Sequence, residues 1–283
     1  MTPATATSPP AQRDAPAATD RWHGSDGASL RYRDQGSGPP VVLVHGWTLD
    51  LEMWRPQLAA LGSGFRLISV DRRGFGLSSG QPSTDRDSSD LQELCRHLSL
   101  GRVALVGMSQ GARAVLNFAI AAPQQVACLV LDGPPDLLSS DAADSPSREQ
   151  YRALVRTEGI AAFRRAWLNH PLVRLWTRDP SAHQALRAMI ERYPGRDLEA
   201  AAVDGTKDPL PAQLPSLQVP TLVITGEHDV AERIAAADAL ARLLPRAERA
   251  TVPKAGHLPN LDNPTAYNAI VRAFLEHHSS ASG

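Results

Sequence analysis

RVALVGMSQGARAVLNFAIAA (residues 102–122) joins an apolar β-like run to an alanine-rich helical run through a short turn flanked by glycines. The centre of this stretch, GMSQG at 107–111, fits the pattern G-x-S-x-G, in which a sharp strand-to-helix turn lifts a serine hydroxyl above the sheet. The N-terminus of the following helix presents backbone N–H groups and the positive end of the helix dipole. The stretch therefore predicts an α/β architecture, with Ser109 as a candidate nucleophile at a strand end.

The rest of the chain alternates short β-rich runs with longer amphipathic segments, which indicates parallel strands joined by helices. Residues 29–36 are expected to form an early antiparallel strand. The expected interior strands are 39–46, 65–71, 102–107, 126–132, 220–226 and 247–252. The expected helices are 50–61, 86–98, 110–121, 231–244 and 264–277. The first five interior runs are nearly continuous in Val, Leu and Ile, as strands covered on both faces should be.

One segment interrupts this alternation. Residues 134–218 follow the strand that ends at Asp132 and contain no convincing strand. Their expected helices are 147–157, 159–168, 171–177 and 181–192. Because insertions of this kind lie where strand ends face a cleft, we expect a helical lid over the site. The predicted organisation is a disordered tail (1–20), a core (21–133 and 219–283) and a lid (134–218).

Composition narrows the class of partner. The 283 residues carry 29 basic and 30 acidic side chains, a net charge of −1 that offers no field for nucleic acid or an anionic membrane. Cys95 and Cys128 form no C-x-x-C arrangement, which argues against a disulfide framework or a thiolate metal site. The sequence shows neither a signal peptide nor an apolar run long enough to span a membrane. We expect a cytoplasmic protein that acts on a small molecule, and a homo-oligomer stays open.

A second match to the serine pattern lies at 76–80, around Ser78. Ser78 stands seven positions beyond Asp71, where the preceding strand is expected to end, and Gln81-Pro82 discourages a helix from starting there. This match is therefore predicted to be a glycine-rich structural loop.

A serine hydroxyl needs a base, and the base needs a buried carboxylate that holds its tautomer. In this architecture the chain order is Ser, acid, His. His257 follows the last expected strand on the short loop TVPKAGH, in which Gly256 allows a sharp turn, so we predict it as the base. The other histidines predicted to lie on the surface are His23, His97, His170, His183, His277 and His278.

Two carboxylates qualify as the acid. Asp229 closes VITGEHD at the end of the strand before the last and is the first choice, although Glu227 and His228 lie beside it. Asp132, at the end of LVLD, is the alternative acid, with a second interpretation as a cap of the turn at Gly133.

Acyl transfer also needs two N–H donors for the oxyanion. The predicted donors are the backbone amides of Gln110 and Trp47, with Thr48 as an alternative to Trp47, while His45 is expected to brace the Trp47 loop. The apolar residues expected in the substrate pocket are Met108, Phe163, Trp167, Trp176 and Leu258. No metal-binding spacing and no phosphate-binding loop occur, so no metal and no cofactor are predicted.

Five motifs occur in one order along residues 22–278: VHGW (44–47), DRRGFGLSS (71–79), GMSQG (107–111), GEHD (226–229) and GHLPNLDNP (256–264). Together they resemble the α/β-hydrolase fold superfamily. The resemblance implies a mostly parallel sheet flanked by helices, with a helical lid inserted after the sixth strand. The first half is especially similar to the cofactor-free haloperoxidase, perhydrolase and aryl-esterase branch, and DRRGFGLSS looks like its non-catalytic structural turn.

Departures from the family pattern narrow the chemistry. Gln110 and Ala112 replace the Met and Gly of the perhydrolase branch, and Leu258 replaces the Trp of ring-fission C–C hydrolases. Ser109, in place of an aspartate, argues against dehalogenases and epoxide hydrolases. We therefore expect a serine hydrolase that cleaves a small, largely apolar ester or lactone through an acyl-enzyme. The alternatives are perhydrolase or haloperoxidase-like activity, C–C bond hydrolysis, and a ligand-sensing receptor that retains the triad.

Overall fold

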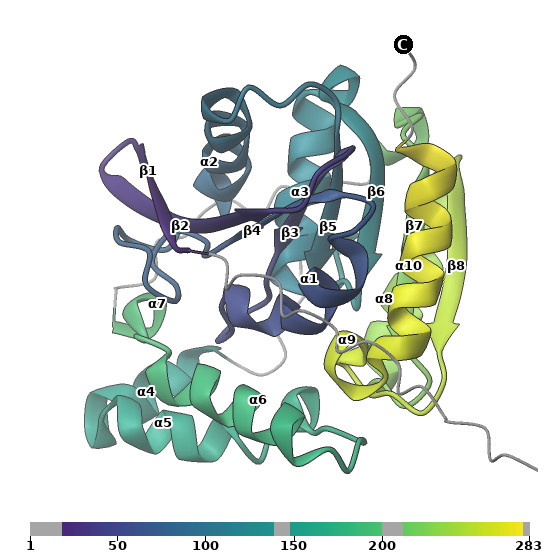
Figure 1. The fold of residues 1–283 in the computed structure, drawn as a ribbon. Coiled ribbons are helices and arrows are strands. Elements are labelled where there is room, and N and C mark those ends of the chain that lie inside the picture. Colours follow the sequence, from purple (N-terminus) through teal and green to yellow (C-terminus); the bar gives the residue numbers. More distant parts are fainter. Residues whose placement is uncertain (1–18, 139–147, 200–211, 280–283) are drawn as a thin grey trace, which may run out of the picture.

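An eight-stranded sheet in the order β1-β2-β4-β3-β5-β6-β7-β8 forms the centre of the molecule (Figure 1). The computed structural model describes residues 19–138, 148–199 and 212–279. The strands are β1 (Arg21–Ser25), β2 (Ala28–Gln35), β3 (Pro40–Val44), β4 (Arg66–Val70), β5 (Val103–Met108), β6 (Val126–Asp132), β7 (Thr221–Gly226) and β8 (Ala247–Val252). In the sheet order from β4 to β8, all neighbouring strands pair in parallel. Strand β2 pairs antiparallel with both β1 and β4. The mostly parallel sheet is the one predicted.

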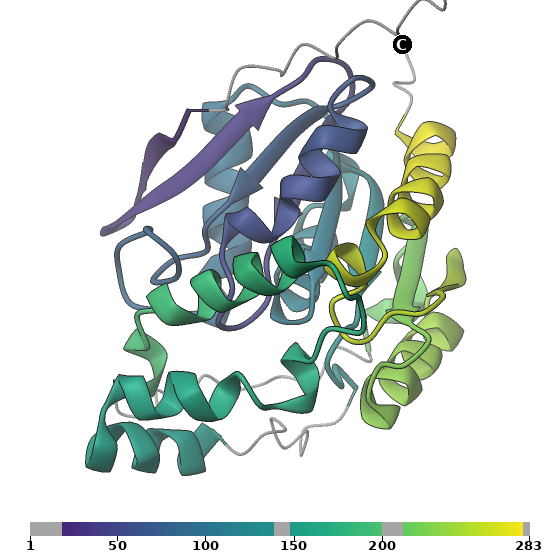
Figure 2. The same cartoon turned by 60° about the horizontal axis from the view of Figure 1, so that its bottom comes forward.

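In the described residues between β6 and β7, four α-helices gather beyond the carboxyl ends of the parallel strands, in the foreground of Figure 2. They are α4 (Arg148–Glu158), α5 (Ile160–Trp167), α6 (Pro180–Arg192) and α7 (Arg196–Glu199), and we call residues 148–199 the helical insertion. Arg192 joins the insertion to the core through a bidentate ion pair with Asp50, with 2.5 Å from Nε to Oδ2 and 2.9 Å from Nη2 to Oδ1. Residues 139–147 and 200–211 of the predicted lid, and 1–18 of the predicted tail, lie outside the described residues.

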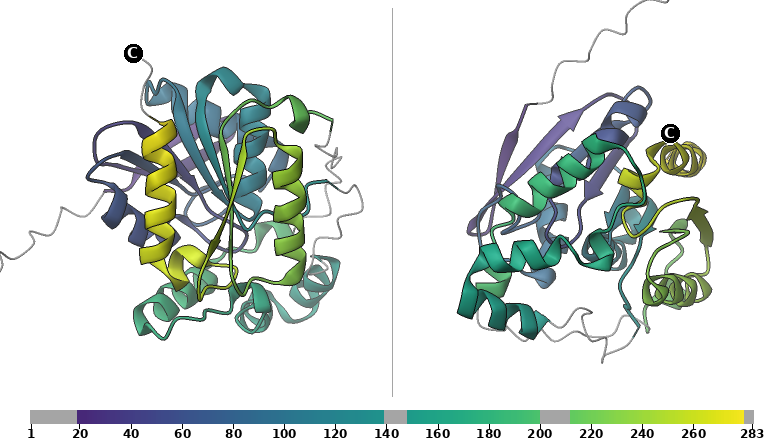
Figure 3. Two further views of the ribbon diagram at one scale, coloured as in Figure 1. Left: turned by 90° about the vertical axis from the view of Figure 1, so that its right-hand side faces the viewer. Right: turned by 90° about the horizontal axis from the view of Figure 1, so that it is seen from below.

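Helices cover both faces of the sheet, as Figure 3 shows from the side and from below. Residues of α1 (Arg55–Leu61) and α10 (Pro264–His278) share one apolar cluster, and residues of α2 (Thr84–His97), α3 (Gln110–Ala121) and α8 (Ala231–Leu243) share the other. In β3, Val41 and Leu43 belong to the first cluster, whereas Val42 and Val44 belong to the second. Two-sided burial explains why the strand sequences are almost uninterrupted in apolar residues. The short elements η1 (Leu51–Trp54), η2 (Pro123–Gln125), η4 (Leu214–Ser216) and α9 (Pro259–Asp262) complete the connections.

Two sequence predictions are wrong, and one strand was missed. Residues 247–252 form an edge strand, because β8 pairs only with β7. Strand β1 was not predicted, since RWHGS is largely exposed and pairs on one side only. The expected helix 171–177 is a single 3-10 turn, η3 (Pro171–Val173), and it ends because Arg174 adopts an extended conformation. Within the described residues, every helix is too short or too polar to cross a membrane.

Candidate active site

Ser109 lies at the tight turn between β5 and α3, with φ 52° and ψ −114°. A positive φ is unfavourable for a residue with a side chain and persists only where the surroundings enforce it. The flanking glycines are required by close backbone: a Cβ on Gly107 would lie 2.3 Å from the Gly111 carbonyl oxygen, and one on Gly111 would lie 2.3 Å from that of Val44. This turn holds Ser109 at the carboxyl end of β5, where it is 7% exposed.

His257 and Asp229 form a buried hydrogen-bonded pair, with 2.9 Å between Nδ1 and Oδ2. The second carboxylate oxygen of Asp229 accepts from the amide of Val230 at 2.7 Å. An ionised carboxylate only accepts hydrogen bonds, so Nδ1 of His257 carries the proton and Nε2 is the basic nitrogen. The pair thus has the tautomer that a general base requires.

Asp132 and Gly133, at the end of β6, contact Ser109 and His257 respectively and so place the pair beside Ser109. The Ser109 amide donates to the carbonyl oxygen of Asp132 at 2.7 Å. On the next residue, Gly133, a Cβ would lie 2.9 Å from Cε1 and 3.0 Å from Nδ1 of His257. The end of β5, the end of β6 and the loop that carries His257 therefore meet at one point, which brings together Ser109, Asp229 and His257.

Asp132 lies deeper and has different surroundings. Its side chain is completely buried, and the hydrogen-bonding group beside its carboxyl is the hydroxyl of Tyr267. Burial and the adjacent charge of Asp229 raise the pKa of Asp132 well above its usual range. The interpretation of Asp132 as a turn cap is wrong, because its side chain bonds no amide of that turn. The imidazole of His257 is bonded to Asp229 and not to Asp132.

The loop after β3 packs against Ser109. A Cβ on Gly46 would lie 3.2 Å from the Cβ of Ser109 and 2.7 Å from the Met108 sulfur. His45 braces this loop as predicted: its Nε2 accepts from the Arg72 amide at 2.9 Å, and Nδ1 donates to the Gly46 carbonyl at 2.7 Å. Burial, with the neighbouring charge of Arg72, lowers the pKa of His45 to about 3, so His45 stays neutral.

The predicted oxyanion donors lie on this loop and at the start of α3. The amide of Gln110 belongs to the first helical turn, where the helix itself supplies no acceptor. Trp47 follows Gly46, and its indole N–H donates to Asp197 at 2.7 Å, so the insertion anchors the loop. Thr48, the alternative donor, has φ 63° and accepts from the Trp167 indole at 2.7 Å.

An aromatic cluster surrounds Trp47 on the side of the insertion. The ring centroids of Tyr151, Phe163, Trp167 and Tyr193 lie between 4.8 and 6.3 Å from the Trp47 ring. The tyrosines were missed by sequence reasoning; Tyr193, next to a proline, resembled a loop residue.

The predicted pocket residues differ in exposure. Met108, Phe163, Trp167 and Leu258 are each no more than 2% exposed. Trp176 is 45% exposed and stacks near His228 at a centroid distance of 4.2 Å.

His170, predicted to lie on the surface, is partly buried and has two specific contacts. Its ring stacks on Trp167, with centroids 4.5 Å apart and an interplanar angle of 13°. The side chain also caps η3 by accepting from the Leu172 amide at 3.2 Å. The cue in the sequence was its place directly before Pro171, a position typical of an N-cap.

Ser78 is structural, as predicted. Its hydroxyl donates to the Asp71 carbonyl at 2.7 Å and accepts from the Arg31 amide at 2.8 Å, and the side chain is buried. The first bond closes the loop after β4 and the second joins that loop to β2, so Ser78 serves the fold.

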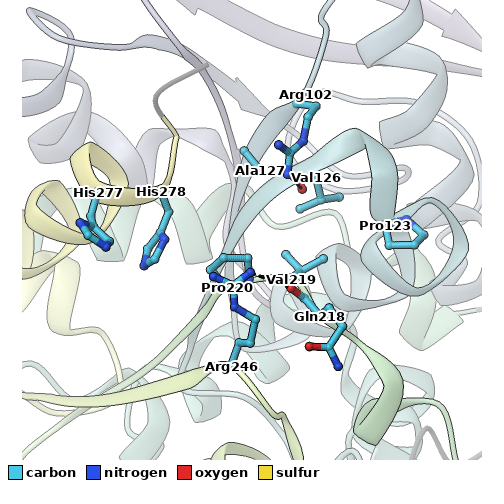
Figure 4. Close-up of a pocket in the computed structure, with 10 residues that line it drawn as sticks. All are labelled: Arg102, Pro123, Val126, Ala127, Gln218, Val219, Pro220, Arg246, His277 and His278. Atoms are coloured by element: carbon cyan, nitrogen blue, oxygen red, sulfur yellow. Dashed lines mark hydrogen bonds between the residues drawn. The ribbon is translucent and has the colours of Figure 1, made fainter. Parts of the chain in front are cut away.

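A cavity of about 360 Å³ lies at the other end of the strands (Figure 4). It is lined by residues near the starts of β6, β7 and β8, together with the end of α10; Arg102, Val126, Pro220, Arg246 and His278 are among them. The cavity is thus separated from Ser109 by the length of β5. Among the described residues, no cluster of three or more His, Cys, Asp or Glu is arranged to hold a metal ion.

Comparison with known proteins agrees with this geometry. Residues 39–264 match the family model of the alpha/beta hydrolase fold. An esterase from Thermogutta terrifontis has a similar structure, with a TM-score of 0.80 and 30% identity over 93% of this chain and 100% of the esterase. An enol-lactonase from Burkholderia xenovorans LB400 has a TM-score of 0.77 and 27% identity, covering 90% of this chain and 100% of the lactonase. A non-heme haloperoxidase from Rhodococcus erythropolis is 27% identical over 89% of this chain and 97% of its own. The chain belongs to the alpha/beta hydrolase family.

Proposed function

We propose that this protein is a serine hydrolase that cleaves a small, largely apolar carboxylic ester or lactone through an acyl-enzyme. The observation that carries the proposal is the buried pair of His257 and Asp229, which leaves Nε2 of His257 as a base next to the strained turn of Ser109. A serine at such a turn, with a base in the correct tautomer, is the arrangement that nucleophilic acyl transfer needs.

In the proposed reaction, the Ser109 hydroxyl attacks the ester carbonyl while Nε2 of His257 takes its proton. Asp229 holds the ring and stabilises the imidazolium that forms. The amides of Trp47 and Gln110 donate to the oxyanion of the tetrahedral intermediate. Collapse of that intermediate breaks the bond to the alcohol oxygen, which takes the proton from His257. Water then attacks the acyl-enzyme with His257 as base, and releases the acid and free Ser109.

The aromatic cluster supports an apolar substrate. The rings of Trp47, Phe163 and Trp167 are mutually packed within 5.9 Å and reach the oxyanion loop through the Trp167–Thr48 hydrogen bond. Such rings favour apolar groups and offer few hydrogen-bonding partners to a polar one. The names of the esterase and enol-lactonase relatives agree with an ester or a lactone as the substrate.

The test is hydrolysis of p-nitrophenyl acetate and of a small lactone by the wild type and by Ser109→Ala. We expect the substitution to remove nearly all turnover, since losses in related triads reach about a millionfold. A fluorophosphonate probe should label the wild type at Ser109, as identified by peptide mass spectrometry. Normal turnover in Ser109→Ala, or labelling at another residue, would refute the proposal.

Perhydrolysis is a second candidate, favoured by the haloperoxidase relative. Here hydrogen peroxide replaces water in the second half-reaction, so that the acyl-enzyme releases a peracid. Peracid formation from acetate and peroxide that exceeds ester hydrolysis in rate, and that Ser109→Ala abolishes, would support this chemistry over ester cleavage.

A further inference from the structure

Residues 167–176 of the helical insertion connect the two loops of the candidate site. At one end, the Trp167 indole donates to the Thr48 hydroxyl on the oxyanion loop. At the other end, the Trp176 ring lies 2.7 Å from where a Cβ on Gly256 would stand, directly before His257. The segment therefore passes over the space between the oxyanion loop and the base.

A single carboxylate fixes the second end of this segment. One oxygen of Asp262 accepts from the amides of Trp176 and Thr177, at 2.6 and 3.0 Å. Its other oxygen accepts from the Gly256 amide at 2.7 Å. Hydrogen bonds to an ionised carboxylate are among the stronger ones in proteins. The segment and the His257 loop are thus held in one fixed relation.

His170 lies within this segment, and its ring orientation is determined on two sides. Stacking on Trp167 fixes the plane of the ring. The hydrogen bond that Nδ1 accepts from the Leu172 amide fixes the rotation of the ring within that plane. Since an amide can only donate, Nδ1 is unprotonated and the neutral ring carries its proton on Nε2. Burial, and the charges of His257 and Arg233, lower the pKa of His170, so the neutral form persists near pH 7.

These contacts place an N–H donor in the segment that joins the two loops of the site. The segment leads from Thr48, through the Trp167 indole, to Trp176 beside Gly256, the residue directly before His257. In the proposed function, the leaving oxygen of the substrate must reach Nε2 of His257 to take its proton. A donor in the insertion on this side of the site therefore faces the alcohol part of an ester more closely than the acyl part.

We propose that His170 is a specificity-determining residue whose Nε2–H binds a hydrogen-bond acceptor in the alcohol part of the substrate. The favoured substrates are esters with an ether or carbonyl oxygen a few bonds from the ester oxygen. This inference rests on the proposed function and deepens it, because the aromatic cluster alone selects only for apolar character.

The experiment compares two esters of the same length, 2-methoxyethyl acetate and butyl acetate, by acid release in a pH-stat. The kcat/KM ratio of the two is divided by the ratio of their hydroxide-catalysed rates, which removes the difference in leaving-group reactivity. We expect a corrected preference of about fivefold for the methoxyethyl ester, which corresponds to the net free energy of one hydrogen bond.

Two variants distinguish the proposed role of His170 as a hydrogen-bond donor to the substrate from its role as the N-cap of η3. Asn in His170→Asn keeps an oxygen that can accept from the Leu172 amide, but it is too short to replace Nε2. Gln in His170→Gln places an amide N–H near the position of Nε2, but it loses the capping geometry. We expect His170→Asn to reduce the corrected preference to about onefold, and His170→Gln to retain most of it.

The outcomes are distinct. A loss of preference in His170→Asn alone supports the inference. Equal preferences in all three proteins, or a loss only in His170→Gln, would overturn it and leave His170 as a helix cap. If the wild type is labelled by fluorophosphonate at Ser109 but shows no corrected preference, only this inference fails. If Ser109 is not labelled and neither ester is cleaved, the proposed function fails as well.

Discussion

Replacing Gly133 by alanine should displace the base of the candidate site without removing any polar group. Gly133 has φ +51°, and a Cβ there would lie 2.9 Å from Cε1 and 3.0 Å from Nδ1 of His257. The nearest oxygen of Asp229 would be 3.5 Å from the same Cβ. The new methyl group therefore presses on the imidazole at the edge that is bonded to Asp229.

The size of the effect follows from these distances. Carbon atoms in contact prefer about 3.5 Å, so the ring of His257 must move by roughly 0.6 Å. Because a misplacement of about 1 Å in an active site costs about a hundredfold in rate, we expect kcat to fall by about tenfold to a hundredfold. The positive φ adds a stability cost of about 1 kcal/mol.

Gly27→Ala is the matched control for Gly133→Ala. Gly27 has φ +74°, in the turn between β1 and β2, and a Cβ there would meet nothing within 4 Å. Both variants carry the backbone cost, but only Gly133→Ala meets His257. The measurements are kcat for p-nitrophenyl acetate, the rate of fluorophosphonate labelling, and urea unfolding. Equal kcat values in the two variants, at equal folded fractions, would show that the ring does not occupy the position described.

Three further predictions concern the buried polar groups. Asp229→Asn should lower kcat by about ten thousandfold and Asp132→Asn by much less; the reverse order, measured with the same ester, would make Asp132 the acid. The pKa of Asp132 is higher in the folded state than in the unfolded state, where it is about 3.9. As the pH rises above about 3.9, the unfolded chain ionises first, so Asp132 should lower the free energy of unfolding. Urea titrations should therefore find Asp132→Asn more stable than the wild type at pH 7, by about 1.4 kcal/mol for each unit of pKa elevation, with no difference at pH 3. His45→Leu leaves the buried Arg72 amide without its acceptor and should lower the free energy of unfolding by about 2 kcal/mol in urea; an unchanged value would contradict the bracing role.

The local pattern around Ser109 was readable from the sequence because its constraints are local. Gly107 and Gly111 are four residues apart and crowd each other across one turn, so the serine pattern reports a backbone conformation directly. The apolar runs were readable for a similar reason, since burial on both faces leaves little choice of residue. The edge position of β8 was missed: 247–252 was expected in the sheet interior, although AERATV lacks the continuous apolar residues of the other five runs.

The roles of Gly133 and His170 depend on contacts between distant segments, which no spacing in the sequence encodes. Gly133 contacts a ring 124 positions later in the chain (257 − 133), and His170 is positioned by Trp167 and by a segment that Asp262 holds in place.

The choice between two carboxylates shows how sheet order decides a site. The loop that carries His257 leaves the end of β8, and β7 is the neighbour of β8 in the sheet, so the carboxylate that follows β7 is the nearer one. Asp132 ends β6, one strand further away, and its side chain is enclosed by the core instead of the loop. The ring of His257 already lies beside Gly133 at the end of β6, so the burial of the Asp132 side chain, and not the reach of the loop, separates Asp132 from the base. The 2.9 Å bond from His257 to Asp229 therefore identifies Asp229 as the acid, and Asp132 stays a buried carboxyl beside the Tyr267 hydroxyl.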